Sequence, residues 1–226
     1  QWDGERMHFE YNGQGVWGLK AVIAGKLGLK PEQVRVTTAD VGGGFGMKNF
    51  PYPEHLAVAE GARAFGRPMR WISERTEAML TDNMGRDHVT SGRAAFDAEH
   101  KLLAIHFQVT AGMGAYNSGF AQNIPSTLAR YVLPSVYDVQ PYFFECKGVY
   151  TNTAPVDAYR GAGRPEAVYQ MDRLMDWAGR ELGVDPVELR RKNFIKVDQM
   201  PYTTAVDENY DEGAFTREQA RGQAES

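Results

Sequence analysis

Two glycine-rich loops are the places in this sequence where the backbone itself could take part in chemistry. The first, "DVGGGFGMK", occupies residues 40–48 and follows a β-branched, strand-like run. The second, "AYRGAGRPEA" at 158–167, places Arg160 and Arg164 on either side of Gly161, Ala162 and Gly163. Glycine is costly to order and adds no side-chain packing, so such loops occur where a backbone must turn sharply or approach a ligand closely.

Each loop is predicted to lead toward a helix N-terminus, where unpaired backbone N–H groups and the helix dipole attract an anion. Arginines beside the second loop could add charge-assisted hydrogen bonds. A ligand-free explanation remains open for either loop alone, because glycine-rich connections and solvated surface arginines are common. Two such loops in one acidic chain favour a phosphate-bearing or oxyanionic cofactor that is held mainly by backbone groups.

Two familiar nucleotide-binding motifs do not fit the first loop. A P-loop needs a lysine directly after its last glycine and then a hydroxyl residue, but Gly46 is followed by Met47, Lys48 and Asn49. The dinucleotide-binding pattern starting at Gly42 would need glycine at position 47. A nucleotide-binding switch domain is therefore disfavoured.

Composition describes an ordinary globular protein and excludes several classes. The 226 residues are 42% hydrophobic and 24% charged, and the net charge is −4, which argues against nucleic-acid binding and a polybasic membrane patch. No run is long enough for membrane insertion. Cys146 is the single cysteine, so no intramolecular disulfide can form and we expect a cytoplasmic location. The five histidines lack metal-ligand spacing, so no metal site built from side chains is predicted.

The periodicity of apolar residues and the positions of glycine, proline and N-cap residues predict a mixed α/β fold. Helices are expected at 14–27, 52–66 and 124–133. Two more are expected, one from Pro165 along an apolar stripe that ends at Leu182 and one that follows Asp185 as its N-cap. Strands are expected at 32–41, 68–74 and 142–151, and a hairpin over 89–112 is expected to turn at 97–101. One domain over 1–206 is expected, followed by an acidic, mobile tail over 207–226.

Five ordered segments carry a resemblance to a known family. The two loops, together with "NGQGVWGLKAVIAGKLGL" before them, "GRPMRWISERTEAML" between them and "ELGVDPVELRRKNFI" after them, resemble the large, molybdenum-binding subunit of the xanthine dehydrogenase, aldehyde oxidase and carbon monoxide dehydrogenase family. The resemblance runs from about Gln14 to Tyr210. It implies the first half of a molybdopterin-binding domain, and hence a fragment or one half of a split unit.

The resemblance also implies roles for particular residues. Gln14 matches the glutamine that hydrogen-bonds an oxo ligand of molybdenum, and Arg160 is the second residue with an expected catalytic role. The cofactor-binding positions form two segments, Gly43, Gly44, Phe45 and Gly46 in the first and Tyr159, Arg160 and Gly161 in the second.

The implied function is that of a molybdenum-dependent oxidoreductase that oxidises an aldehyde or N-heterocycle with water as oxygen source. The implied cofactor is molybdenum-molybdopterin in its cytosine dinucleotide form, with [2Fe-2S] clusters and FAD on partner subunits or domains. Further partners would be the remaining half of the large subunit and the small-molecule substrate. The alternative is a non-catalytic or degenerate member of the same fold that acts as a cofactor-binding or assembly module.

Several positions depart from the family patterns. Gly161 stands where carbon monoxide dehydrogenase has its copper-bearing cysteine, so a copper centre is not expected. Asn49 replaces a glutamate of xanthine dehydrogenases, and their substrate-binding arginine falls on Leu128, two residues from Arg130, so purine hydroxylation is not expected. The base glutamate has no counterpart in 203–226, and this chain alone is therefore expected to be inactive.

Overall fold

The computed structural model describes residues 1–224, which form two compact units. The first unit combines Gln1–Gly85, Met113–Ala121 and Tyr150–Arg160, whereas the second combines Arg86–Gly112, Gln122–Val149 and the chain from Gly161 onward. Each unit thus draws on stretches that are far apart in the sequence. The mixed α/β fold class is confirmed.

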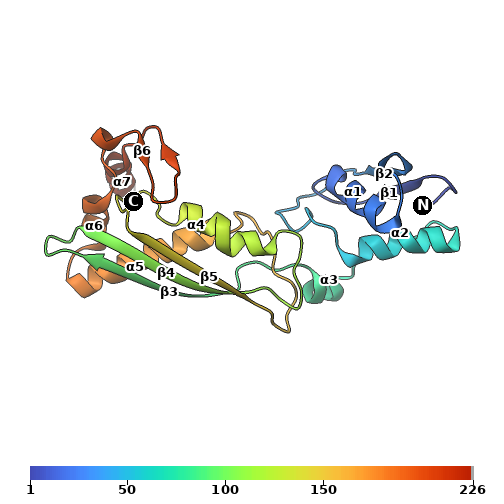
Figure 1. Ribbon diagram of the computed structural model, residues 1–226, viewed down its shortest axis with the longest axis horizontal. Helices are drawn as coiled ribbons and strands as arrows, with labels where there is room; N and C mark the ends of the chain where they lie inside the picture. The colour runs from blue at the N-terminus through green and yellow to red at the C-terminus, as the bar shows by residue number, and fades with distance from the viewer. Residues whose placement is uncertain (225–226) are drawn as a thin grey trace. The chain divides into compact units, whose positions relative to one another are not determined.

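The first unit is a two-stranded parallel sheet with helices packed against it (Figure 1). Strand β1 (Met7–Glu10) pairs with β2 (Val34–Thr37), and Met7 lies opposite Val34 in the register. The other elements are α1 (Val16–Leu27), the 3₁₀ turn Pro31–Gln33, α2 (Pro53–Phe65) and α3 (Arg75–Thr81). Met7, Ile23 and Val34 are completely buried in this core, so the burial of apolar side chains holds the helices on the strands.

Helices α1 and α2 lie within two residues of their predicted bounds and end at the predicted glycines. Gly28 and Gly66 follow their last residues in the left-handed conformation, with φ of 64° and 59°. Glycine adopts this conformation without steric cost, and it lets the chain leave the helix. Pro53 occupies the first turn of α2, where its missing N–H is not needed.

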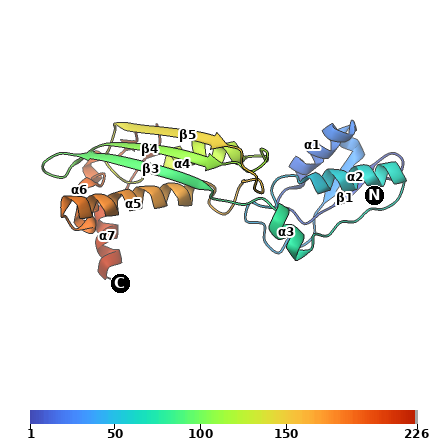
Figure 2. The same cartoon turned by 90° about the horizontal axis from the view of Figure 1, so that it is seen from below.

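The second unit is built on a three-stranded sheet in the order β3-β4-β5 (Figure 2). β3 (His88–Phe96) and β4 (Leu102–Gly112) form the expected antiparallel hairpin, and β5 (Tyr142–Val149) pairs with β4 in parallel. The hairpin turns as predicted, because the Asp97 carboxylate accepts the Lys101 N–H at 2.7 Å.

Helices cover one face of this sheet. The long helix α5 (Arg164–Leu182) and the short α4 (Ala129–Val132), which continues a π-helical turn at Ile124–Leu128, contribute to the same core. The remaining elements are the 3₁₀ turns Ala121–Asn123 and Val197–Gln199, α6 (Pro186–Asn193), β6 (Tyr202–Thr203), β7 (Asn209–Tyr210) and α7 (Phe215–Ala224).

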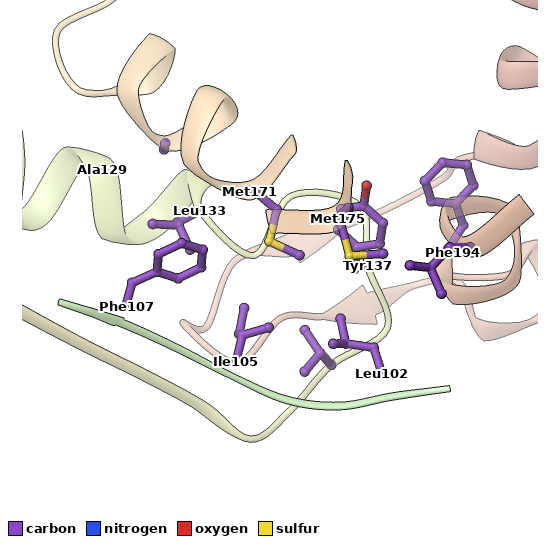
Figure 3. Close-up of a cluster of buried hydrophobic side chains, with 12 residues drawn as sticks. Leu102, Ile105, Phe107, Ala129, Leu133, Tyr137, Met171, Met175 and Phe194 are labelled. Atoms are coloured by element: carbon purple, nitrogen blue, oxygen red, sulfur yellow. The ribbon is translucent and has the colours of Figure 1, made fainter. Parts of the chain in front are cut away.

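Figure 3 shows the core between α5 and strand β4. Met171 and Met175 from α5 face Ile105 and Phe107 from β4, and all four are at most 2% exposed. Most of the predicted stripe, which runs from Val168 to Leu182, faces this core, since Leu174 and Ala178 also pack against it. The stripe's two end residues, Val168 and Leu182, are 48% and 37% exposed, while Ala167 joins the buried face.

Three expectations about elements need comment. Residues 68–74 form no strand in the part of the chain described; they run without regular structure into α3 and find no ladder partner. Residues 207–224 include β7 and α7, and the Tyr210 hydroxyl donates to the Ser135 carbonyl at 2.8 Å. The division into a domain over 1–206 and a mobile tail stays a prediction, and its last two residues, 225–226, lie outside the described residues.

Candidate functional site

The first glycine loop has an unusual backbone. Gly42, Gly43 and Gly46 have φ of 68°, 101° and 95°, and Phe45 has a φ of 55° although it carries a side chain. A β-carbon on Gly46 would lie 2.6 Å from the carbonyl oxygen of Ala158, so only glycine fits this close backbone approach. A side-chain-bearing residue at positive φ is strained, and such strain is typical of functional loops.

Gln14, two residues before the first residue of α1, holds this loop. Its side-chain Oε1 accepts the N–H groups of Gly46 at 2.8 Å and of Lys48 at 3.3 Å, while its own N–H donates to the Lys48 carbonyl at 2.9 Å. Gly44 must also be small, because a β-carbon there would lie 2.2 Å from Gln14 Cγ. In residues 1–224 the side-chain hydrogen bonds of Gln14 use Oε1, which leaves its Nε2 group to donate to a ligand.

Two further hydrogen bonds close the loop at its ends. The Lys48 ammonium donates to the Val41 carbonyl at 3.0 Å, and the Tyr52 hydroxyl donates to the Met47 carbonyl at 3.0 Å. Burial raises the pKa of Tyr52 to about 12, so its hydroxyl remains a donor at neutral pH. The loop conformation is therefore held by one contact across the loop and by one from Tyr52 outside it.

The segment before the second glycine loop lies against the first. The Arg160 N–H donates to the Phe45 carbonyl at 2.8 Å, and the Arg160 guanidinium lies 5.7 Å from the centre of the Phe45 ring, a cation–π distance. Tyr159 packs closely on Gly85, because a β-carbon added to Gly85 would lie 2.9 Å from the Cβ of Tyr159. Residues 45 and 160 are thus joined although they are distant in the sequence.

Asp157 fixes this segment, and sequence reasoning missed it. The side chain is buried, and its two oxygens accept the N–H of Ala158 at 2.7 Å and the N–H of Phe120 at 3.2 Å. Its own N–H donates to the Met84 carbonyl at 2.9 Å. The available signal was weak: one acidic residue beside apolar residues, directly before "AYRG".

The second glycine loop belongs to the second unit and leads into α5. Gly161, Ala162 and Gly163 have φ of 98°, 42° and 92°, so three consecutive residues are left-handed. A β-carbon on Gly161 would lie 2.5 Å from Pro165 Cδ, and one on Gly163 would lie 2.3 Å from the Ile124 carbonyl oxygen. Both glycines are therefore required by their surroundings as well as by their φ angles.

The structure brings most of the expected site residues together. Gln14, Gly43, Gly44, Phe45 and Gly46, with Tyr159 and Arg160, belong to the first unit, whereas Gly161 belongs to the second. Within residues 1–224 no protein acceptor takes the N–H groups of the four consecutive residues 42–45. Successive N–H groups of a turn can form a concave donor surface for an anion. Such a surface, next to the Gln14 amide, suits the oxygen-rich pterin phosphate and oxo groups of a molybdopterin cofactor.

Side-chain metal ligation has no support in the part of the chain described, since no three His, Cys, Asp or Glu residues come together there. Each helix in residues 1–224 is too short or too polar to cross a lipid bilayer.

Comparison with known proteins gives concordant matches. The family described as the molybdopterin cofactor-binding domain matches residues 1–194. Over 87% of its own length, this chain is 34% identical to the carbon monoxide dehydrogenase large chain of Hydrogenophaga pseudoflava. It is 31% identical to the gamma subunit of the 6-hydroxypseudooxynicotine dehydrogenase complex of Paenarthrobacter nicotinovorans over 85%. Among solved structures, quinoline 2-oxidoreductase from Pseudomonas putida 86 matches 99% of the chain with a TM-score of 0.90 and 30% identity.

The chain matches only part of the length of each relative. The chain spans 25% of each of the two curated relatives and 29% of the quinoline 2-oxidoreductase chain. The relatives are therefore more than three times as long as the sequence described.

Proposed function

Because this chain belongs to the molybdopterin cofactor-binding domain family, we propose that it is part of the large subunit of a molybdenum hydroxylase. The complete enzyme would oxidise an aldehyde or an N-heterocycle with water as oxygen source. Relatives named for the oxidation of heterocyclic compounds support this substrate class.

One observation carries the proposal: the joining of Gln14, the first glycine loop and Arg160 into a single donor-rich surface. Gln14 Oε1 holds Gly46, and the Arg160 N–H holds Phe45. Left-handed residues also occur in ordinary turns, but a ligand-free turn would not need a buttressing glutamine or the run of N–H groups at 42–45 that lack protein acceptors within residues 1–224.

The residues of this surface would hold the pterin cofactor without ligating its metal. The N–H groups of residues 42–45 would bind its oxygen atoms, and Gln14 Nε2 would donate to an oxygen ligand of molybdenum. Arg160 would add positive charge beside the bound group. Molybdenum-molybdopterin, when bound, supplies the two-electron redox chemistry, while the protein supplies orientation and electrostatics.

The finer assignments are proposed on the family pattern. The pterin would carry cytosine dinucleotide, and electrons would leave through [2Fe-2S] clusters and FAD on partner subunits or domains. The remaining part of the large subunit would complete the pocket in a cytoplasmic enzyme. Names such as "large chain" and "complex subunit gamma" among the relatives support a multi-subunit assembly.

A copper-bridged centre is disfavoured by the geometry at Gly161. Cu(I) requires a soft ligand such as a thiolate. A cysteine at this position would place its β-carbon 2.5 Å from Pro165 Cδ at a φ of 98°. The loop in this conformation therefore has no room for the copper ligand, and Ala162 leaves a small side chain in the next position.

The experiment is elemental and pterin analysis of the complete protein that contains this chain, followed by a turnover assay with aldehydes and N-heterocycles and an artificial electron acceptor. Molybdenum, cytosine dinucleotide pterin and turnover together are the expected result. Cofactor without turnover would indicate a non-catalytic module, and the absence of both molybdenum and pterin would refute the proposal.

A further inference from the structure

A buried carboxylate lies at the N-terminus of α5, directly behind the second glycine loop. Glu166 is 9% exposed, and its Oε2 accepts the N–H of Gly163 at 3.1 Å. Its Oε1 lies 3.8 Å from Nε of Arg86, which makes a loose ion pair. A buried carboxylate is costly unless it is paired and hydrogen-bonded, and both conditions are met here.

The same arginine reaches the loop. Arg86 Nη2 lies 3.8 Å from the position that a β-carbon on Gly161 would occupy. Glu166 and Arg86 therefore contact the loop at its two glycines, one through a hydrogen bond and the other through proximity. Between these glycines, Ala162 has a φ of 42° and must be held in place by its surroundings.

The neighbouring turn of α5 is polar as well. Gln170 is 8% exposed, and its Nε2 donates to Thr90 Oγ1 on β3 at 3.1 Å. Apolar side chains of similar size would pack between α5 and β3 at lower cost. Glu166 is thus not explained by packing alone, while its hydrogen bond to the loop gives it a specific task.

We propose that Glu166 is a positioning residue for the cofactor site. Its hydrogen bond to Gly163 holds residues 161–163 in their left-handed conformation, while the loose ion pair with Arg86 offsets the cost of burying the carboxylate. The hydrogen bond thereby fixes Gly161, the last residue of the second cofactor-binding segment. The role in cofactor binding rests on the proposed function, whereas the hold on the loop does not depend on it.

Three variants of the complete protein separate the hydrogen bond from the charge. Glu166→Gln keeps an oxygen acceptor at the same reach and removes the charge. Glu166→Asp keeps the charge, but its shorter side chain withdraws from Gly163. Glu166→Leu removes both, and Glu181→Gln on the exposed side of α5 is the matched control.

The measurements are hydrogen exchange of the peptide covering 161–166, molybdenum content, and kcat and KM separately. The Leu and Asp variants should exchange about tenfold faster in this peptide, which corresponds to the loss of one buried hydrogen bond. They should also lose molybdenum or kcat by a similar factor, with KM nearly unchanged. The Gln variant and the Glu181→Gln control should stay close to wild type.

Two outcomes would overturn the inference. One is unchanged exchange and unchanged molybdenum content in both the Asp and Leu variants. The other is a loss in the Gln variant with normal behaviour of the Asp variant, which would assign the effect to charge alone. If the Leu variant does not fold, the Asp and Gln pair still decides. If wild type holds no molybdenum, the exchange data test the loop role while the proposed function fails.

Discussion

The side-chain oxygen of Gln14 accepts the backbone N–H of Gly46 at 2.8 Å, although 32 positions separate the two residues. This bond orients the glutamine, because Oε1 turned toward the loop leaves the Nε2 donor on the other side of the amide. One residue thus both shapes the loop and presents a neutral donor beside it. A neutral donor suits an oxo ligand because it adds no charge to the metal centre.

Two substitutions of Gln14 in the complete protein should separate these roles. Gln14→Glu keeps acceptors for Gly46 and Lys48 but loses the donor, so stability should be nearly unchanged while kcat falls. Gln14→Leu removes two exposed hydrogen bonds and should lower the free energy of unfolding by about 0.5–1.5 kcal/mol. Thermal unfolding and steady-state kinetics measure both effects. Normal kcat in Gln14→Glu would show that the donor has no role.

The Gly161 position predicts the metal content. The purified complete protein should contain molybdenum without stoichiometric copper, and it should not oxidise carbon monoxide efficiently, because glycine offers no thiolate. Elemental analysis and a carbon monoxide oxidation assay test this prediction. Copper in equal amount to molybdenum, with rapid carbon monoxide turnover, would show that the loop is misinterpreted despite the crowding at Pro165 Cδ.

The half-buried His88 on β3 predicts how stability depends on pH. Burial lowers the pKa of His88, while the nearby carboxylates of Glu166 and Asp87 oppose this shift. Its folded pKa therefore lies below the unfolded value of about 6.5, so protonation favours the unfolded state. The contribution of His88 is complete above that value and is lost as the pH falls through it.

The melting temperature should accordingly fall from about pH 7.5 to about pH 5.5, and His88→Gln should reduce this fall. Burial also lowers the pKa of His55, so part of the fall should remain in the variant. An identical slope in His88→Gln would contradict the prediction.

Local signals in the sequence predict much of the fold, because capping is a short-range property. Asp185 is the N-cap of α6 as expected, and its carboxylate accepts the Val187 N–H at 2.6 Å. The strand predicted at 68–74 was wrong, because alternation of apolar and polar residues alone cannot supply a neighbouring strand to pair with. The parallel pairing of β1 with β2 was missed for the related reason that it joins residues across a whole helix.

The candidate site divides in the same way. The two loops were predictable from their local glycine content, and the family resemblance implied the roles of Gln14, Tyr159 and Arg160. The bond from Arg160 to Phe45 and the buried carboxylate of Asp157 were not predictable, because both depend on tertiary contacts. Glu166 was recognisable from a sequence pattern, because it lies three residues after the glycine N-cap of α5 with a proline between them.

The isolated chain should have no hydroxylase activity. It spans about a quarter of its curated relatives, and no glutamate base motif was found in 203–226. Incubation with molybdenum cofactor, an artificial electron acceptor and a panel of aldehydes and N-heterocycles should give no turnover. Reproducible turnover that depends on molybdenum would overturn this expectation.

The most direct test of the account is the molybdenum and pterin content of the complete protein with Gly46→Ala. A methyl group would meet the Ala158 carbonyl oxygen at 2.6 Å and would strain a φ of 95°, so the loop must move away from Gln14 and the segment 158–160. Gly18→Ala on α1, where nothing lies within 4 Å, is the matched control. The account predicts a folded Gly46→Ala protein that has lost most of its molybdenum and pterin, beside a fully loaded Gly18→Ala protein. Full cofactor content in Gly46→Ala would show that the loop is only a turn.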